Sequence, residues 1–215
     1  VFIPCCKGDY EYMRILPQKG TTGIYKRVSY DFPSWFNLAK MVIIDKTVTE
    51  IGEEAFSECY TLSSVTIPNS VNKIGIKSFS GCEELISVSI PNSVKEISSF
   101  AFQDCSKLTN IKIPETITEL EYHIFCRCTK LIEVKIPGTV TTIKMNAFTN
   151  CSSLKSIKIP VSVKTIEYEA FENCISLTSV DMSNSVTNIG DYVFSGCRQL
   201  DTINIPNSIT TIGNG

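Results

Sequence analysis

The chain has 215 residues, of which 43% are hydrophobic and 20% are charged, a composition typical of folded globular proteins. Its 20 lysines and arginines stand against 22 aspartates and glutamates, so the chain lacks the basic excess that drives binding to nucleic-acid phosphates. No apolar run approaches the roughly 18 residues that indicate a membrane-spanning helix. We therefore expect neither a nucleic-acid partner nor insertion into a membrane.

Residues 1–37 hold the one tryptophan, Trp35, and half of the eight tyrosines. The rest of the chain is repetitive, and a stack of repeats exposes its core at each end unless something covers it. Phe32, Trp35 and Phe36 are bulky enough to do so. We predict that residues 1–37 form a capping segment or a degenerate repeat; a piece of a separate domain is the alternative. Val1-Phe2-Ile3-Pro4 imitates the strand of a repeat out of register, which hints at an earlier repeat followed by an insertion.

From residue 38 to residue 215 one pattern returns every 23 residues. Three invariant columns are the phenylalanines Phe56, Phe79, Phe102, Phe125, Phe148, Phe171 and Phe194, the cysteines Cys59, Cys82, Cys105, Cys128, Cys151, Cys174 and Cys197, and the leucines Leu62, Leu85, Leu108, Leu131, Leu154, Leu177 and Leu200. Such a period predicts a solenoid in which each unit packs on its neighbours. We predict about seven full units plus a truncated one, with a degenerate first unit from about Leu38 through Val42 and Ile44.

The unit at residues 62–84 shows the elements that we expect in each repeat. Val65 and Ile67 alternate with polar residues, which predicts a short strand with one buried face. Pro68 ends it, so each strand should have three or four residues. An aliphatic position at Ile74 then predicts a short second strand or turn, followed by one helical or 3₁₀ turn. The fold class is therefore an α/β-type repeat solenoid, mostly strand and irregular structure, with short parallel strands on its concave face.

Two further columns concern the interior. Short hydroxyl residues follow each proline, and we expect them to accept hydrogen bonds from backbone N–H groups of the next turn: Thr47, Ser70, Ser93, Thr116, Thr139, Ser162, Ser185 and Ser208. The cysteine column falls in a single file, where parallel side chains are poorly oriented for disulfides. We interpret these cysteines as free, buried thiols that act as small hydrophobic groups. Cys5 and Cys6 are interpreted as free or loosely paired rather than as a ligand pair.

The sequence holds no recognisable catalytic motif, cofactor motif or metal motif. Its one histidine, His123, stands in a column of unlike residues, which indicates a solvated outer position. His123 with Cys126 and Cys128 could be imagined as part of a zinc site, but Cys128 belongs to the core file and no fourth ligand is indicated. We predict a chain that is not an enzyme and that needs neither cofactor nor metal.

The outward positions of the strands carry the most informative variation. One column holds three adjacent lysines, Lys112, Lys135 and Lys158, which should repel one another at the spacing of paired strands. Glu133 offsets them only in part. A charged run of this kind can mark a contact site for an acidic partner; the alternative is that flexible lysines merely discourage aggregation. The candidate partner-binding residues are Lys112, Lys135, Lys158, Glu133, Lys155, Ile86 and Ile132.

The run Leu-x-x-Val/Ile-x-Ile-Pro-x-x-Val/Ile-x-x-Ile-Gly-x-x-Ala-Phe-x-x-Cys, carried by residues 62–212, closely resembles the BspA-like, or treponemal-type, leucine-rich repeat. The resemblance implies a curved, non-catalytic surface that binds other macromolecules. It also implies a cell-surface or secreted protein, as is common among such proteins of oral and gut bacteria and of parasitic protists. Ordinary leucine-rich repeats carry asparagine where this chain has its Ser/Thr column, so the ligands of those families are not carried over.

Two hypotheses of function follow. The first is a protein-binding module that meets a protein, for instance a host surface or matrix protein, through its concave sheet. The second is an intracellular, cytoplasmic scaffold or structural repeat without a dedicated ligand face. The chain begins without methionine and ends at Gly215 partway through a unit, so we expect it to be an excerpt of a longer protein. Under the first hypothesis, replacing the three lysines by glutamate should abolish partner capture and leave the melting temperature unchanged or higher.

Overall fold

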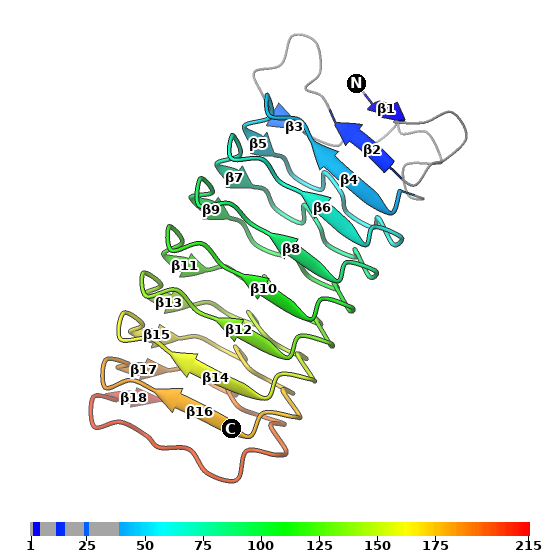
Figure 1. Cartoon of the computed structure of the whole chain (residues 1–215). Coiled ribbons are helices and arrows are strands. Elements are labelled where there is room, and N and C mark those ends of the chain that lie inside the picture. The colour runs from blue at the N-terminus through cyan, green and yellow to red at the C-terminus, as the bar shows by residue number, and fades with distance from the viewer. Residues whose placement is uncertain (1, 5–11, 16–23, 26–38) are drawn as a thin grey trace.

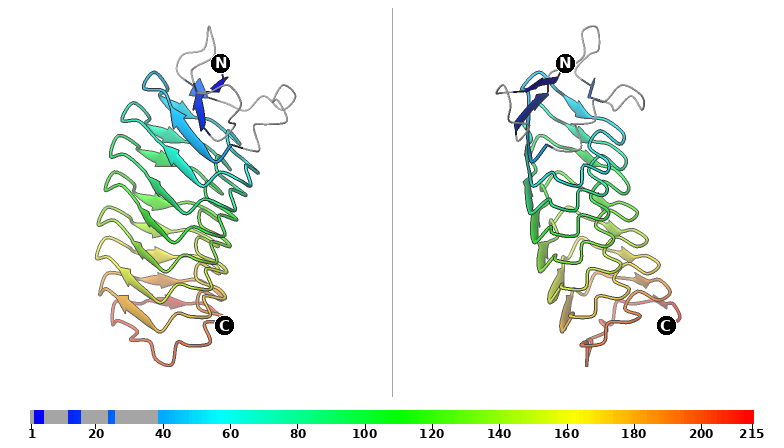
Figure 2. Two further views of the ribbon diagram at one scale, coloured as in Figure 1. Left: turned by 45° about the vertical axis from the view of Figure 1, so that its right-hand side comes forward. Right: turned by 90° about the vertical axis from the view of Figure 1, so that its right-hand side faces the viewer.

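The chain winds into a stack of rungs, each formed by one repeat (Figure 1). The computed structural model describes residues 2–4, 12–15, 24–25 and 39–215. In these residues the regular elements are all short strands, and no helix is present. Within a rung, a first strand, a second strand and a run of turns succeed one another. They occupy three sides of the stack, and Figure 2 shows the same stack of rungs in two further views.

The first strand of each rung lies on what we call the long-strand face. The strands are β4 (Met41–Ile44), β6 (Ser64–Thr66), β8 (Ser87–Ser89), β10 (Asn110–Lys112), β12 (Glu133–Lys135), β14 (Ser156–Ile159) and β16 (Ser179–Met182). Neighbours pair in parallel with equivalent residues opposite one another, as Val65 and Val88 are, except that no strand pairing joins β12 to β14. The strands have three or four residues, as predicted. Their middle side chains are buried and the flanking ones face outward.

The second strand of each rung lies on the short-strand face and has two residues. These strands are β5 (Glu50–Ile51), β7 (Lys73–Ile74), β9 (Glu96–Ile97), β11 (Glu119–Leu120), β13 (Thr142–Ile143), β15 (Thr165–Ile166), β17 (Asn188–Ile189) and β18 (Thr211–Ile212). Together with β3 (Ile24–Tyr25) they form two parallel sheets, with orders β3-β5-β7-β9 and β11-β13-β15-β17-β18. The second strand predicted at the aliphatic column is thereby confirmed.

Turns replace the helical or 3₁₀ segment that the sequence led us to expect. In each rung, alternate N–H groups of this segment donate to the next rung and the others donate within their own turn. Phe56 N donates to Ser78 O at 2.7 Å, for example, whereas Cys59 N donates to Phe56 O at 3.2 Å. The segment therefore forms a third backbone ladder along the stack, which satisfies its amides without a helix.

This third ladder uses left-handed backbone at two positions of each rung. One of them is the column of His123, where φ is 54° and N–H donates to Met145 O at 3.1 Å. The column also contains Glu54, Lys77, Phe100, Asn146, Glu169 and Tyr192, all with φ between 53° and 63°. The prediction of a solvated outer position was wrong for Asn146, which is 7% exposed, and incomplete for the half-buried Phe100 and His123. Backbone hydrogen bonding, rather than exposure, is what these unlike residues share.

The phenylalanine column forms the centre of the core. Consecutive rings stack with centroid separations of 5.1 Å between Phe56 and Phe79 and 5.9 Å between Phe102 and Phe125. The rings from Phe56 to Phe171 are fully buried, while Phe194 in the last rung is half-buried. The leucine column and the strand aliphatics close around the rings, which confirms the core predicted from the period.

The cysteine file runs beside the phenylalanine stack as free thiols, as predicted for the residues that the structure describes. From Cys82 to Cys197, each thiol of the file donates to the carbonyl of the phenylalanine in the preceding rung; Cys128 Sγ lies 3.2 Å from Phe102 O. Burial raises the pKa of the Cys105 and Cys151 thiols. These cysteines therefore add a weak hydrogen-bonded ladder to their role as small core residues. Cys5 and Cys6 lie outside the described residues.

The hydroxyl column corrects one of our expectations. In five of its eight members the side chain donates to a carbonyl of the preceding rung instead of accepting from an N–H group. Thr47 donates to Asp45 Oδ1, and the buried hydroxyls of Ser70 and Ser162 have no hydrogen-bond partner in the described part of the chain. Ser93 Oγ donates to Val71 O at 2.6 Å, and Thr139 Oγ1 donates to Ile117 O at 2.7 Å. The reason is that the strand ladders already use the nearby N–H groups, which leaves turn carbonyls in need of a donor.

At the start of the chain the structure describes three strands, β1 (Phe2–Pro4), β2 (Tyr12–Ile15) and β3 (Ile24–Tyr25). β2 and β3 pair in parallel with β4 and β5. β1 runs antiparallel to β2 and so is not an earlier rung of the parallel stack. The interpretation of residues 1–37 as a capping segment or degenerate repeat stays a prediction, and Phe32, Trp35 and Phe36 lie outside the described residues.

Candidate functional site

All seven residues of the candidate partner-binding set lie at or next to the outward side of the long strands and are exposed. Lys112 and Lys135 stand directly opposite each other in the pairing of β10 with β12. Lys158 is at the equivalent position of β14, opposite Asp181 of β16. Because the intervening strand residues are buried, the backbone holds these side chains outward at fixed spacing.

Acidic neighbours partly neutralise the lysine column. Lys158 Nζ lies 3.1 Å from Asp181 Oδ2, and Lys135 Nζ lies 3.5 Å from Glu115 Oε1. Both lysine side chains remain 82% exposed. Lys112 forms no ion pair with any residue that the structure describes. The three lysines therefore do not simply repel one another, and glutamate at 135 or 158 would remove an ion pair and add a repulsion. Glutamine is the cleaner substitution for a binding test.

Ile86 and Ile132 lie one position before β8 and β12 and are 52% and 45% exposed. The rung between them places Thr109 at the same position, where its N–H bonds Ile86 O at 3.1 Å. Lys155 follows Ile132 in the next rung. The two isoleucines thus border the lysine column as separate side chains rather than as one apolar patch.

A pocket that the sequence analysis missed opens beside the lysine column. It has a volume of about 370 Å³ and is lined by Glu115, Lys135, Ile136, Gly138, Lys158 and Pro160. Two of the predicted lysines form its rim. The signal in the sequence is the column that follows the strand prolines, where Asn69, Asn92, Asn184 and Asn207 give way to Gly138 and Val161.

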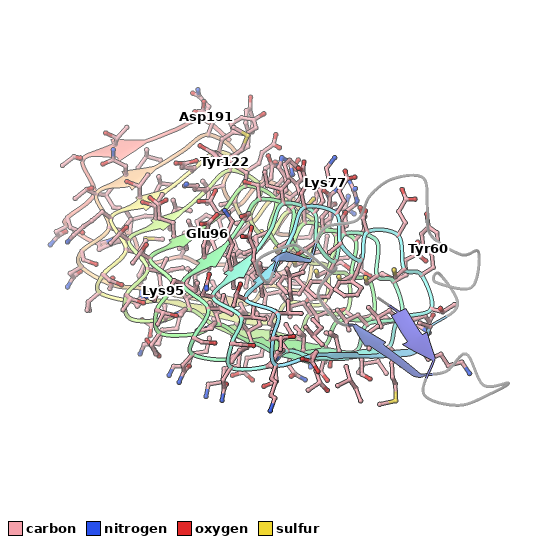
Figure 3. The ribbon with its side chains drawn as sticks, turned by 90° about the horizontal axis from the view of Figure 1, so that it is seen from above. Tyr60, Lys77, Lys95, Glu96, Tyr122 and Asp191 are labelled. Atoms are coloured by element: carbon pink, nitrogen blue, oxygen red, sulfur yellow. The ribbon has the colours of Figure 1, made fainter. Side chains whose placement is uncertain are left out.

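The short-strand face carries a different chemistry. A second hollow of about 370 Å³ is lined by Glu50, Glu53, Glu96 and Lys73 around Gly52 and Gly75. Lys73 Nζ pairs with Glu96 Oε1 at 3.1 Å. Figure 3, which looks down the stack, shows Glu96 on this side and Lys77, Tyr122 and Asp191 along the edge where the turns begin.

His123, Cys126 and Cys128 do not form the zinc site considered from the sequence. The His123 ring stacks on Phe100 with 4.7 Å between centroids, and burial lowers the pKa of its imidazole. Burial also raises the pKa of Cys126 to about 11. Among the residues that the structure describes, no group of three or more His, Cys, Asp and Glu side chains could hold a metal ion.

Among the eight described cysteines, Cys197 is expected to react first with iodoacetamide under native conditions, at least about tenfold faster than Cys128. Cys197 is half-buried in the last rung, whereas Cys128 is fully buried and burial raises its pKa, which suppresses the reactive thiolate. Mass-spectrometric mapping of partly alkylated protein measures both rates. Equal labelling of the two thiols would contradict the buried file.

Comparisons with known proteins agree with this geometry. The BspA type leucine rich repeat region matches in six copies over residues 28–153 and 120–215. A leucine-rich repeat protein from Bacteroides ovatus superposes with a TM-score of 0.78 at 37% identity, covering 81% of this chain and 45% of that protein. The leucine-rich repeat protein of T. pallidum gives a TM-score of 0.70 at 32% identity, covering 75% and 78%.

The chain therefore spans less than half the length of the Bacteroides ovatus protein. No curated protein matches it. No helix among the described residues is long and apolar enough to cross a membrane. The repeat columns, the parallel rungs and the matching copies lead to one conclusion: the chain belongs to the BspA-type leucine-rich repeat family.

Proposed function

We propose that this chain is a non-catalytic protein-binding module whose long-strand face holds an acidic surface of a partner. Its repeat family supports protein interaction in general. The observation that carries the proposal is the row of Lys112, Lys135 and Lys158, which projects outward from the long strands and is only partly neutralised. The strands fix the backbone positions of the three lysines before binding, so the ordering entropy lost on association is mainly that of the side chains.

The charge of this surface predicts how it binds. Exposed lysines attract an acidic partner over about a Debye length, roughly 8–10 Å at physiological salt. They mainly raise the association rate and the selectivity. Binding should therefore weaken as salt is raised. The acidic side chains Glu115, Glu133 and Asp181 lie among the lysines and would repel a partner carboxylate placed opposite them, so they restrict the registers in which an acidic partner can dock.

We further propose that the partner is met outside the cell, in adhesion or in contact with a host surface or matrix protein. The resemblance to surface-exposed and secreted proteins supports this location. The alternative is an intracellular scaffold without a ligand face. Surface labelling of the full-length protein in its own cells distinguishes the two, since a scaffold would be protected from a membrane-impermeant reagent.

Replacing Lys112, Lys135 and Lys158 together by glutamine is expected to reduce partner capture at least about tenfold, equivalent to about 1.4 kcal/mol or more of binding free energy. The matched control replaces Lys77, Lys95 and Lys164 by glutamine, which removes the same charge outside the long strands. Capture from extracellular and cytosolic fractions is quantified by mass spectrometry for both variants and the original chain.

The control variant should capture the same proteins as the original chain. Both variants should unfold within about 1 kcal/mol of it, because exposed ion pairs contribute little to stability. A folded site variant that captures the same proteins as strongly as the control would rule out the lysine column as the binding surface.

A further inference from the structure

The position that follows the strand proline, or Ser183 in the rung that lacks the proline, carries a polar side chain in most rungs and a glycine in one. Successive rungs carry Asn69, Asn92, Glu115, Gly138, Val161, Asn184 and Asn207 there. Gly138 and Val161 thus interrupt the column of polar side chains in two of the three rungs that carry the lysine column. The next rung places Val161 there, with 77% of its surface exposed.

The fold does not require a glycine at position 138. A Cβ atom built there meets nothing within 4 Å, and the backbone is outside the left-handed region that favours glycine. A glycine at such a position is unfavourable by about 0.4–1 kcal/mol relative to alanine, because the unfolded chain loses more freedom on folding. Gly75 differs, since its Cβ would lie 2.7 Å from the carbonyl carbon of Gly52. Rung packing therefore accounts for Gly75 but not for Gly138.

The absent side chain opens the pocket at the end of the long strands. Ile136, which is buried, and Pro160 supply apolar lining, and Lys135 and Lys158 stand at the rim. Glu115 braces this rim from the preceding rung. Its Oε2 accepts the Gly138 N–H at 3.1 Å, and its Oε1 lies 3.5 Å from Lys135 Nζ. The result is an apolar hollow with ammonium groups beside it.

We propose that this pocket binds one large aliphatic side chain of the acidic partner, a proposal that rests on the proposed function. Carboxylates on either side of that aliphatic side chain contact Lys135 and Lys158. The volume of about 370 Å³ is near the lower end of the roughly 300–1,000 Å³ typical of ligand pockets, so it suits one side chain rather than a folded segment. Charge complementarity selects the acidic flanks. A buried apolar anchor with a charged rim is the usual arrangement of an interface hot spot.

The test uses three synthetic peptides with the isotope-labelled full chain, read by NMR shifts of the Gly138 amide and the Ile136 methyl groups. The first peptide is Glu-Glu-Leu-Glu-Glu, the second replaces leucine by serine, and the third replaces the glutamates by lysine. We expect the leucine peptide to bind with a Kd on the order of 1 mM, and each of the other two at least about tenfold more weakly. If the leucine peptide does not bind, or if the serine peptide binds equally well, the proposal that the pocket binds an aliphatic side chain is wrong.

The matched variant is Gly138→Asn, which installs the residue that four other rungs carry and leaves every lysine in place. It should weaken the leucine peptide at least about tenfold without lowering the melting temperature. The reverse change two rungs away, Asn92→Gly, should leave peptide binding unaltered. If Gly138→Asn binds the leucine peptide as tightly as the original chain does, the proposal that this pocket binds the leucine side chain is wrong.

The two proposals fail separately. The lysine surface is judged by capture with the triple glutamine variant, whereas the pocket is judged by the leucine-to-serine comparison and by Gly138→Asn. Loss of capture on removal of the lysines, together with full binding by Gly138→Asn, would keep the lysine surface and discard the pocket. The peptide comparison on the original chain decides the question even if a variant folds poorly.

Discussion

Replacing Phe125 by alanine is expected to lower the free energy of unfolding by about 3–5 kcal/mol, the range for large-to-small changes at a fully buried aromatic residue. Phe125 is fully buried and stacks on Phe102 at 5.9 Å and on Phe148 at 5.4 Å. Neither neighbour can fill the space, because the same backbone ladder that holds Phe125 also fixes their rungs. Urea denaturation followed by far-ultraviolet circular dichroism measures the loss.

Phe194→Ala is the matched control at the end of the stack. Phe194 is half-buried and stacks on Phe171 alone, at 5.7 Å, so the same change should remove roughly half as much stability. A central cavity should also weaken the coupling between the two halves of the array, so we expect Phe125→Ala to unfold in two steps and the original chain to unfold in one. Equal losses for the two variants would show that the stacked column is not the continuous core described here.

The period predicted the core because burial repeats with the rungs. The ring of Phe79 packs on the equivalent ring of Phe102. Equivalent positions therefore have the same surroundings in successive rungs, and the same residue type suits all of them. The strand ends followed from the prolines for the same reason. The short-strand position at Ile74 could be predicted as well, since its column is aliphatic in each rung.

The turn ladder could be predicted only in part, because backbone groups form it. One of its two left-handed columns does carry glycine, asparagine or aspartate in most rungs, at Gly81, Asp104, Asn150, Asn173 and Gly196. Left-handed backbone usually appears in a sequence as glycine or asparagine, yet the column of Phe100 and His123 contains almost every chemical class. Burial of Phe100 against His123 and the N–H bonds to the next rung offset the unfavourable backbone conformation. Tertiary contacts thus override the local preference.

The candidate site was predictable in position but not in its details. The lysine column follows from strand alternation, so Lys112 and Lys135 face outward where expected. The ion pairs to Glu115 and Asp181 depend on side chains from a different turn or rung. The pocket at Gly138 depends on a missing side chain, which became informative only when the structure showed that the glycine has no steric cause.

Replacing Gly75 by alanine is expected to destabilise the chain by about 1–3 kcal/mol, as overpacking of a tight contact does. The new Cβ would lie 2.7 Å from Gly52 C and 2.8 Å from Glu53 N, both backbone atoms that cannot rotate away. The rungs would have to separate there, which strains the hydrogen bond of 2.7 Å from Gly75 N to Ile51 O. The same column carries Ser98 in the next rung, so the requirement for glycine comes from the local approach of two rungs and not from the repeat.

The same substitution at the other glycine, Gly138→Ala, is expected to change the stability in the opposite direction. Its Cβ has open space, so alanine should stabilise the chain by about 0.4–1 kcal/mol through the unfolded state. Denaturant midpoints of the two alanine variants, measured side by side, provide the comparison. Destabilisation at position 138 would mean that the fold does need this glycine, which would remove the reason for assigning its absent side chain to binding. Opposite signs would show that one glycine serves the packing of rungs and that the fold does not require the other.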